Sequence, residues 1–69
     1  DEELAMWLSL LGSCRKWGNI GLGKLAFARA IEIDKGSGAA YILMGNIFAS
    51  FGFQKDAKNV ELMRLKYAT

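Results

Sequence analysis

Residues 7–18 read WLSLLGSCRKWG, and residues 41–52 read YILMGNIFASFG. The second stretch repeats the pattern of the first at an offset of 34 positions, with large apolar residues falling on large apolar residues and glycine on glycine. The matched positions are Trp7 and Tyr41, Leu8 and Ile42, Leu10 and Met44, Trp17 and Phe51, and Gly18 and Gly52. The chain therefore uses one unit of 34 residues twice.

Each unit predicts a pair of helices, because its apolar residues recur at the three-and-four spacing of one helical face. Glycines 18 and 52 are suited to end the first helix of each pair in a left-handed conformation. The pattern places helices at residues 2–17, 22–33, 39–51 and 54–67. The glycines and serine of residues 34–38 favour a linker between the units. We expect an all-α fold of two antiparallel helix pairs, with units at residues 1–35 and 36–69.

A helix–turn–helix unit of this period indicates a tetratricopeptide-like α-solenoid fragment. The match weakens at the end of the second unit, where Glu61 stands at a position expected to be aromatic and Arg64 at one expected to be alanine. The last helix is therefore expected to face water or a further segment. Because such arrays usually need about three units for stability, we also expect the 69-residue chain to self-associate.

The composition excludes several classes of function. Nine Lys and Arg against seven Asp and Glu give a net charge of +2, which is too small to indicate nucleic-acid binding by itself. No apolar run approaches the roughly 20 residues that span a bilayer, so no membrane is expected. With no histidine and the single cysteine Cys14, the chain lacks the residues of a zinc site or a histidine-dependent triad. Cys14 falls on an apolar helical face, so we predict a core role, no cofactor, no metal and no catalysis.

The two units resemble the extension (E) motifs of plant pentatricopeptide-repeat proteins. Residues 7–15, WLSLLGSCR, resemble the W-x-x-L-L-x-x-C-R opening of the first E motif, and its G-N-x-x-L-G continuation follows at residues 18–23. Residues 41–52 are similar to the Y-V-L-L-S-N-I-Y-A-x-x-G of the second. The departures are Trp17 for histidine, Gly21 for glutamate and Lys35 for proline.

The resemblance implies a part of an RNA-editing factor in a mitochondrion or chloroplast, with any transit peptide upstream of this chain. In that family, upstream repeats recognise single-stranded RNA. The E motifs connect them to a DYW-type cytidine deaminase domain, on the same chain or recruited, with help from multiple organellar RNA editing factors. The implied function is a non-catalytic link in C-to-U editing.

The first helices of the two units are expected to line a shallow concave face, as in other solenoids. By repeat position this face carries Ser9, Gly12, Arg15, Lys16, Leu43, Asn46 and Ser50. Trp17, at the end of the first helix, is a candidate interface anchor, because tryptophan is enriched at binding hot spots. We predict that this face, with Trp17, docks a deaminase domain or an editing-factor protein.

Two alternatives remain at this point. The chain is an RNA-contacting extension of the repeat array through Ser9, Arg15 and Lys16, or it is a generic tetratricopeptide module that binds peptides. Against base reading, Leu43 has no hydrogen-bonding group at the position where Ser9 stands in the first unit. Base stacking is also disfavoured, because Trp7, Tyr41, Phe48 and Phe51 recur at packing positions of the repeat.

Overall fold

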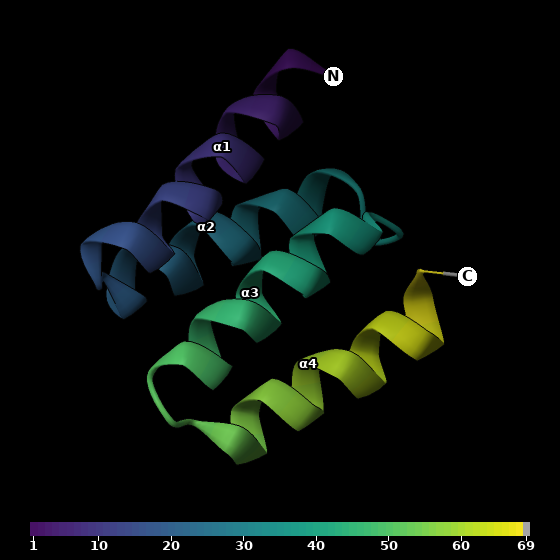
Figure 1. Cartoon of the computed structure of the whole chain (residues 1–69). Coiled ribbons are helices and arrows are strands. Elements are labelled where there is room, and N and C mark those ends of the chain that lie inside the picture. Colours follow the sequence, from purple (N-terminus) through teal and green to yellow (C-terminus); the bar gives the residue numbers. More distant parts are fainter. Residues whose placement is uncertain (69) are drawn as a thin grey trace.

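Four helices joined by short connections make up the computed structural model, which describes residues 1–68 (Figure 1). The helices are α1 (Glu2–Trp17), α2 (Ile20–Ile33), α3 (Gly38–Ser50) and α4 (Gln54–Tyr67). The predicted all-α fold is confirmed, and no strand occurs in the described part of the chain. Thr69, which ends the second predicted unit, lies outside the described residues.

The ends of the first two helices are set by short polar side chains and by glycine. Asp1 Oδ1 accepts hydrogen bonds from the backbone N–H groups of Glu3 (2.8 Å) and Leu4 (3.3 Å). Gly18 ends α1 at a φ of 71°, in the left-handed region that glycine adopts without strain. Asn19 then caps α2 by accepting from the N–H of Leu22 at 3.0 Å. This cap explains why α2 begins at Ile20, two residues before the predicted start.

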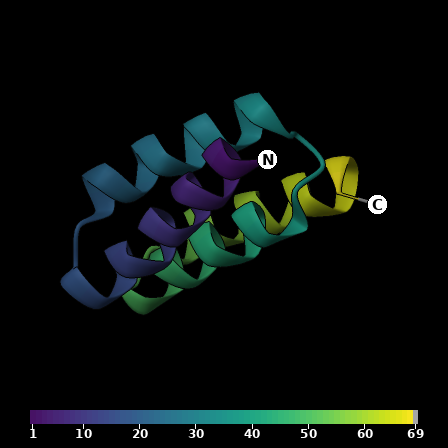
Figure 2. The same ribbon diagram turned by 90° about the horizontal axis from the view of Figure 1, so that it is seen from above.

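The helices form two antiparallel pairs, α1 with α2 and α3 with α4. Helix α3 packs against both helices of the first pair, and α1 and α3 run side by side (Figures 1 and 2). Within residues 1–68, α4 packs against α3 alone. Helix α3 is thus packed between the first helix pair and α4, whereas α4 is an outer helix with one neighbouring helix.

The core lies around α3, where this helix meets the first pair on one side and α4 on the other. Its buried side chains are Leu11, Cys14, Ala26, Tyr41, Met44, Ile47, Phe48 and Val60. The rings of Phe27 and Tyr41 meet edge to face with centroids 5.6 Å apart. Gly23 on α2 is buried at this junction, and a Cβ there would lie 3.3 Å from Ile47 Cδ1 and 3.5 Å from Cys14 Cβ. The missing side chain lets three helices approach each other.

The linker between the units is tied to both α3 and α4. The hydroxyl of Tyr41 donates a hydrogen bond of 2.6 Å to the backbone carbonyl of Lys35. The ammonium of Lys35 lies over the ring of Tyr67, 4.1 Å from its centroid, which is a favourable cation–π contact. Lys35 therefore has a packing role of its own at the position where the E motif has proline.

Several large apolar residues are exposed, and one of them, Phe51, was predicted to pack. Phe51, Leu62 and Leu65 each leave more than a third of their surface open, as does Leu25 on α2. The assignment of Phe51 to the packed aromatic set was therefore wrong. Leu62 and Leu65 are exposed because α4 has a helix against only one side, so an apolar pattern wider than that contact has nothing in the described chain to cover it.

Replacing Gly23 with valine tests the helix junction. We expect Gly23→Val to lower the free energy of unfolding by about 1–3 kcal/mol, because the new side chain enters a space already filled by Ile47 and Cys14. Urea unfolding followed by circular dichroism measures the change. The matched control is Gly12→Val, a helical glycine with nothing within 4 Å of its Cβ position. Equal stabilities of the two variants would contradict the account.

Candidate interaction surface

A hydrogen bond joins the two helices that were predicted to line the concave face. The guanidinium Nε of Arg15 on α1 donates to the hydroxyl of Ser50 on α3 at 3.0 Å. Both side chains are exposed, so this bond adds little to stability, but it connects residues 35 positions apart in the sequence. The first helices of the two units are therefore linked at this point by a contact between exposed polar side chains.

The remaining predicted residues lie on the same two helices and differ in exposure. Ser9 and Asn46 are exposed, and Leu43 is half-buried against the core cluster. In the described part of the chain, no side-chain hydrogen bond links these three residues to Arg15 or Ser50. The structure thus joins one pair of the predicted polar residues and leaves the others as separate groups on the same helices.

Trp17 is the most exposed large apolar residue among those described, with 75% of its surface open. The ammonium of Lys16 lies 5.4 Å from the centroid of its ring, within cation–π range. Trp17 at the end of α1 is therefore open to contact, as a candidate interface anchor has to be. Lys16 and Trp17 form a second pair within the predicted set.

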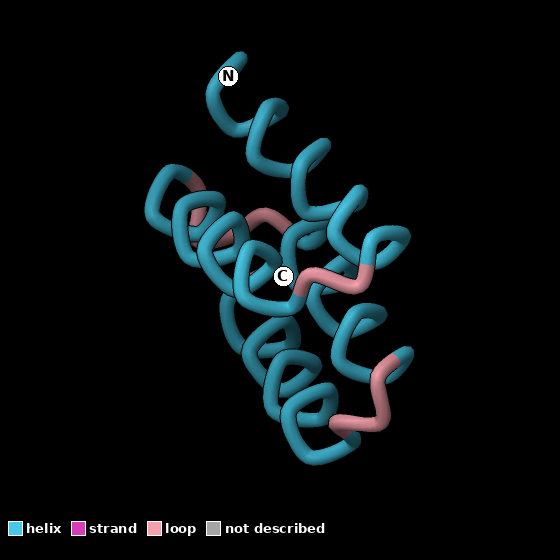
Figure 3. The backbone as a smooth tube through the Cα atoms, turned by 90° about the vertical axis from the view of Figure 1, so that its left-hand side faces the viewer, coloured by secondary structure: helices cyan, strands magenta, loops and turns pink. Residues whose placement is uncertain are grey.

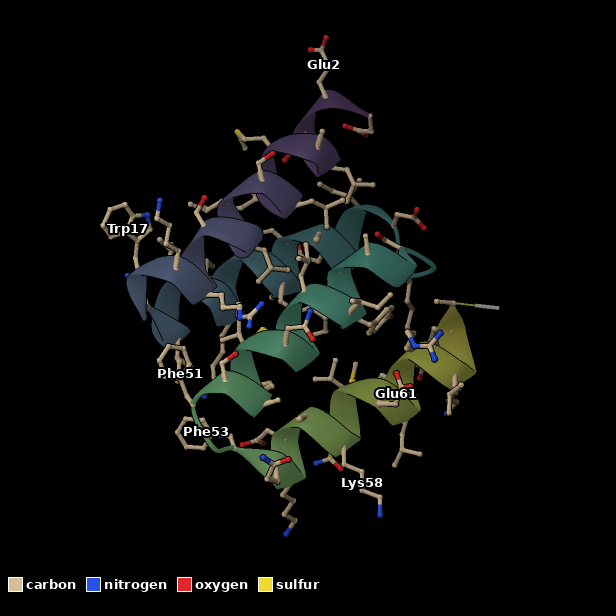
Figure 4. All side chains as sticks on the ribbon, viewed as in Figure 1. Glu2, Trp17, Phe51, Phe53, Lys58 and Glu61 are labelled. Carbon is tan, nitrogen blue, oxygen red and sulfur yellow. The ribbon has the colours of Figure 1, made fainter. Side chains whose placement is uncertain are left out.

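Two aromatic residues near Trp17 were missed by the sequence analysis. Both helix turns, at residues 18–19 and 51–53, lie at the same end of the molecule, which faces the viewer in Figure 3. Phe51 and Phe53 are 41% and 46% exposed at this end, and Figure 4 shows them along the same edge of the molecule as Trp17. The ring of Phe51 lies against Gly18. The repeat itself carried the missing signal, because Phe51 is the equivalent of the exposed Trp17.

The surface has no feature of a catalytic or metal centre in residues 1–68. These residues enclose no pocket, and they bring no three of His, Cys, Asp and Glu together around a common point. None of the described helices is long and apolar enough to cross a membrane. Cys14 is buried, and this burial raises the pKa of its thiol, which favours the unreactive protonated form.

The outer end of the second unit carries an ion pair where the first unit carries a packing site. Glu61 and Arg64 form two hydrogen bonds of 2.6 and 2.9 Å, and the hydrogen bond from Arg64 lowers the pKa of the Glu61 carboxyl. At the repeat offset these two residues correspond to Phe27 and Ala30, the α2 residues that lie where α3 packs. A third helix in the corresponding place would have to cover a charged pair.

Residues 17–68 of the chain match the E motif family. A pentatricopeptide repeat-containing protein of Arabidopsis thaliana is 34% identical over 96% of the chain, which spans 14% of that relative. Another, named as chloroplastic, is 42% identical over 75% of the chain and 6% of its own length. A third, named as mitochondrial, is 36% identical over 96% of the chain and 11% of its own length. The chain thus spans only a small part of these curated relatives, and no solved structure matches it.

The burial of Cys14 predicts that its thiol reacts slowly with alkylating reagents. At pH 8 we expect the folded chain to react with iodoacetamide at least about tenfold more slowly than the urea-unfolded chain, because a raised pKa leaves less thiolate and the sulfur is covered. Mass spectrometry of timed samples gives both rates. Equal rates would show that Cys14 is open to solvent.

The Glu61–Arg64 pair predicts that a second copy of the chain stacks only weakly against α4. The double variant Glu61→Phe/Arg64→Ala restores the residue types of the first unit, and we expect it to self-associate at a lower concentration than the parent chain. Sedimentation equilibrium measures the difference. The control Lys58→Phe/Lys66→Ala adds the same apolar groups elsewhere on α4 and is expected to change association less. Equal association of the two variants would remove the capping role of the ion pair.

Proposed function

The chain belongs to the E motif family of plant pentatricopeptide-repeat proteins, and from this premise we propose that it is a non-catalytic docking domain. Its partners are a DYW-type cytidine deaminase domain, an organellar editing-factor protein, or both. The domain links them to upstream repeats that bind single-stranded RNA. The parent protein acts in C-to-U editing in a mitochondrion or chloroplast, a location supported by the names of two relatives.

The observation that carries the proposal is the Arg15–Ser50 hydrogen bond. It joins the exposed sides of α1 and α3 into one surface, with Asn46 one turn before Ser50 and Trp17 two residues after Arg15. We call this set the docking face: Ser9, Arg15, Lys16, Trp17, Leu43, Asn46 and Ser50. A shallow polar surface with one large exposed anchor suits a protein loop or extended segment better than a small molecule, which needs a concave site.

The runner-up function is direct contact with RNA, and two features disfavour it. The formal net charge of +2 is too small to indicate nucleic-acid binding by itself. Leu43, half-buried and apolar, offers no donor or acceptor to a base edge. The family match argues against the other alternative, a generic tetratricopeptide peptide-binding module.

Reversing the charge of Arg15 and Lys16 tests the docking face. We expect Arg15→Glu/Lys16→Glu to weaken binding to a purified DYW-type deaminase domain or editing-factor protein by about tenfold or more, because it removes the central polar contacts and places like charge there. Biolayer interferometry measures the affinity. Both residues are exposed, so the thermal melt should stay close to that of the parent chain.

The matched control is Lys58→Glu/Lys66→Glu, which makes the same change of charge on α4. Equal loss of binding in the two variants would indicate a general charge effect and reject the docking face. The same titration with single-stranded RNA over a range of salt separates the runner-up. Tight RNA binding that falls steeply with salt and is lost in Arg15→Glu/Lys16→Glu would replace the proposal with RNA contact.

A further inference from the structure

Three exposed aromatic side chains lie together at the end of the molecule where the two helix pairs turn. We call Trp17, Phe51 and Phe53 the aromatic edge. They come from the end of α1 and from the connection between α3 and α4, and they line one side of the molecule in Figure 4. Because exposed apolar surface of this kind is unfavourable in water, several exposed aromatic side chains on one side of the molecule indicate a binding surface.

Each ring of the aromatic edge is already held by the protein on one side. Phe53 meets the buried ring of Phe48 edge to face, with centroids 6.3 Å apart. Phe51 lies against Gly18, and the ammonium of Lys16 lies over Trp17. A base can stack only on a free ring face, and the ammonium of Lys16 lies over one face of Trp17. Large exposed aromatic rings suit apolar side chains of a protein, because aromatic residues commonly anchor protein interfaces.

The charges around the aromatic edge are mostly positive. Near the turns, the last turn of α1, the first five residues of α2 and the first turn of α4 carry one acidic residue, Asp56, and four basic ones: Arg15, Lys16, Lys24 and Lys55. Lys24 also lies over the ring of Phe48, next to Phe53. Most of the acidic residues are at the opposite end of the helices: Asp1, Glu2, Glu3, Glu32 and Asp34. The opposite end also carries the basic residues Arg29, Lys35, Arg64 and Lys66, so the excess of positive charge lies at the aromatic edge, where it favours an acidic partner.

We propose that the aromatic edge binds an acidic protein segment that carries apolar side chains. The apolar groups pack between Trp17 and Phe51, and the carboxylates face the surrounding lysines and Arg15. The edge is continuous with the docking face through Arg15 and Trp17, so the inference rests on the proposed docking function and adds the chemical class of the partner.

The test compares two short synthetic peptides that share leucine and phenylalanine and differ only in having glutamate or lysine at the remaining positions. Fluorescence anisotropy with the 69-residue chain measures both affinities. We expect the glutamate peptide to bind about tenfold or more tightly than the lysine peptide. Trp17→Ala/Phe51→Ala is expected to weaken the glutamate peptide by about tenfold or more. Trp17→Ala alone provides a second variant that removes a largely exposed side chain and leaves the fold intact.

The matched control is Leu62→Ala/Leu65→Ala, which removes two exposed apolar side chains from α4 and should leave peptide binding unchanged. Equal binding of the two peptides, or of the parent chain and Trp17→Ala/Phe51→Ala, would overturn the inference. Tighter binding of a single-stranded oligouridine that is lost in the same double variant would assign the edge to RNA and also overturn it. If the peptides fail while Arg15→Glu/Lys16→Glu still weakens the deaminase domain, the docking function stands and only this inference falls.

Discussion

The packing of α3 against both helices of the first unit is the contact on which the rest of the structure depends. The approach is close at Gly23 of α2, where a Cβ would lie 3.3 Å from Ile47 Cδ1 on α3 and 3.5 Å from Cys14 Cβ on α1. Once α3 is seated there, α1 and α3 lie side by side and Arg15 reaches Ser50. The same arrangement places both helix turns at one end, which gathers Trp17, Phe51 and Phe53. A packing constraint in the core thus determines which residues meet on the surface.

The two units share a sequence pattern but not an environment. The first unit receives α3 on Ala30 and Phe27, whereas the second presents the Glu61–Arg64 ion pair at the equivalent positions. An ion pair exposed to water has little effect on stability, whereas burying the pair under another helix carries a large desolvation penalty. The two units therefore differ in their outer surfaces. The first unit presents apolar residues to a following helix, whereas the second presents a charged pair to water or to a polar partner.

The periodicity of the sequence was enough to predict the helices and their ends. The four predicted ranges agree with the observed ones to within two residues, because Gly18 and the apolar spacing act locally. Exposure was harder to predict, since it depends on neighbours that no local pattern specifies. Leu62 and Leu65 continue an apolar pattern but have no helix against them, and Phe51 lies at a turn rather than in the core. The docking face was predicted residue by residue, but the contact between Arg15 and Ser50 follows only from how α3 packs on α1.

The central claim is that the docking face on α1 and α3 binds a protein partner, and mapping that contact by nuclear magnetic resonance tests it most directly. A ¹⁵N-labelled chain would be titrated with an unlabelled DYW-type deaminase domain, and the backbone amide shifts followed. The account predicts the largest changes at Arg15, Trp17, Asn46 and Ser50, with the outer side of α4 unaffected. Changes centred on Leu62 and Leu65 of α4, or changes that arise with single-stranded RNA and not with the protein, would contradict it.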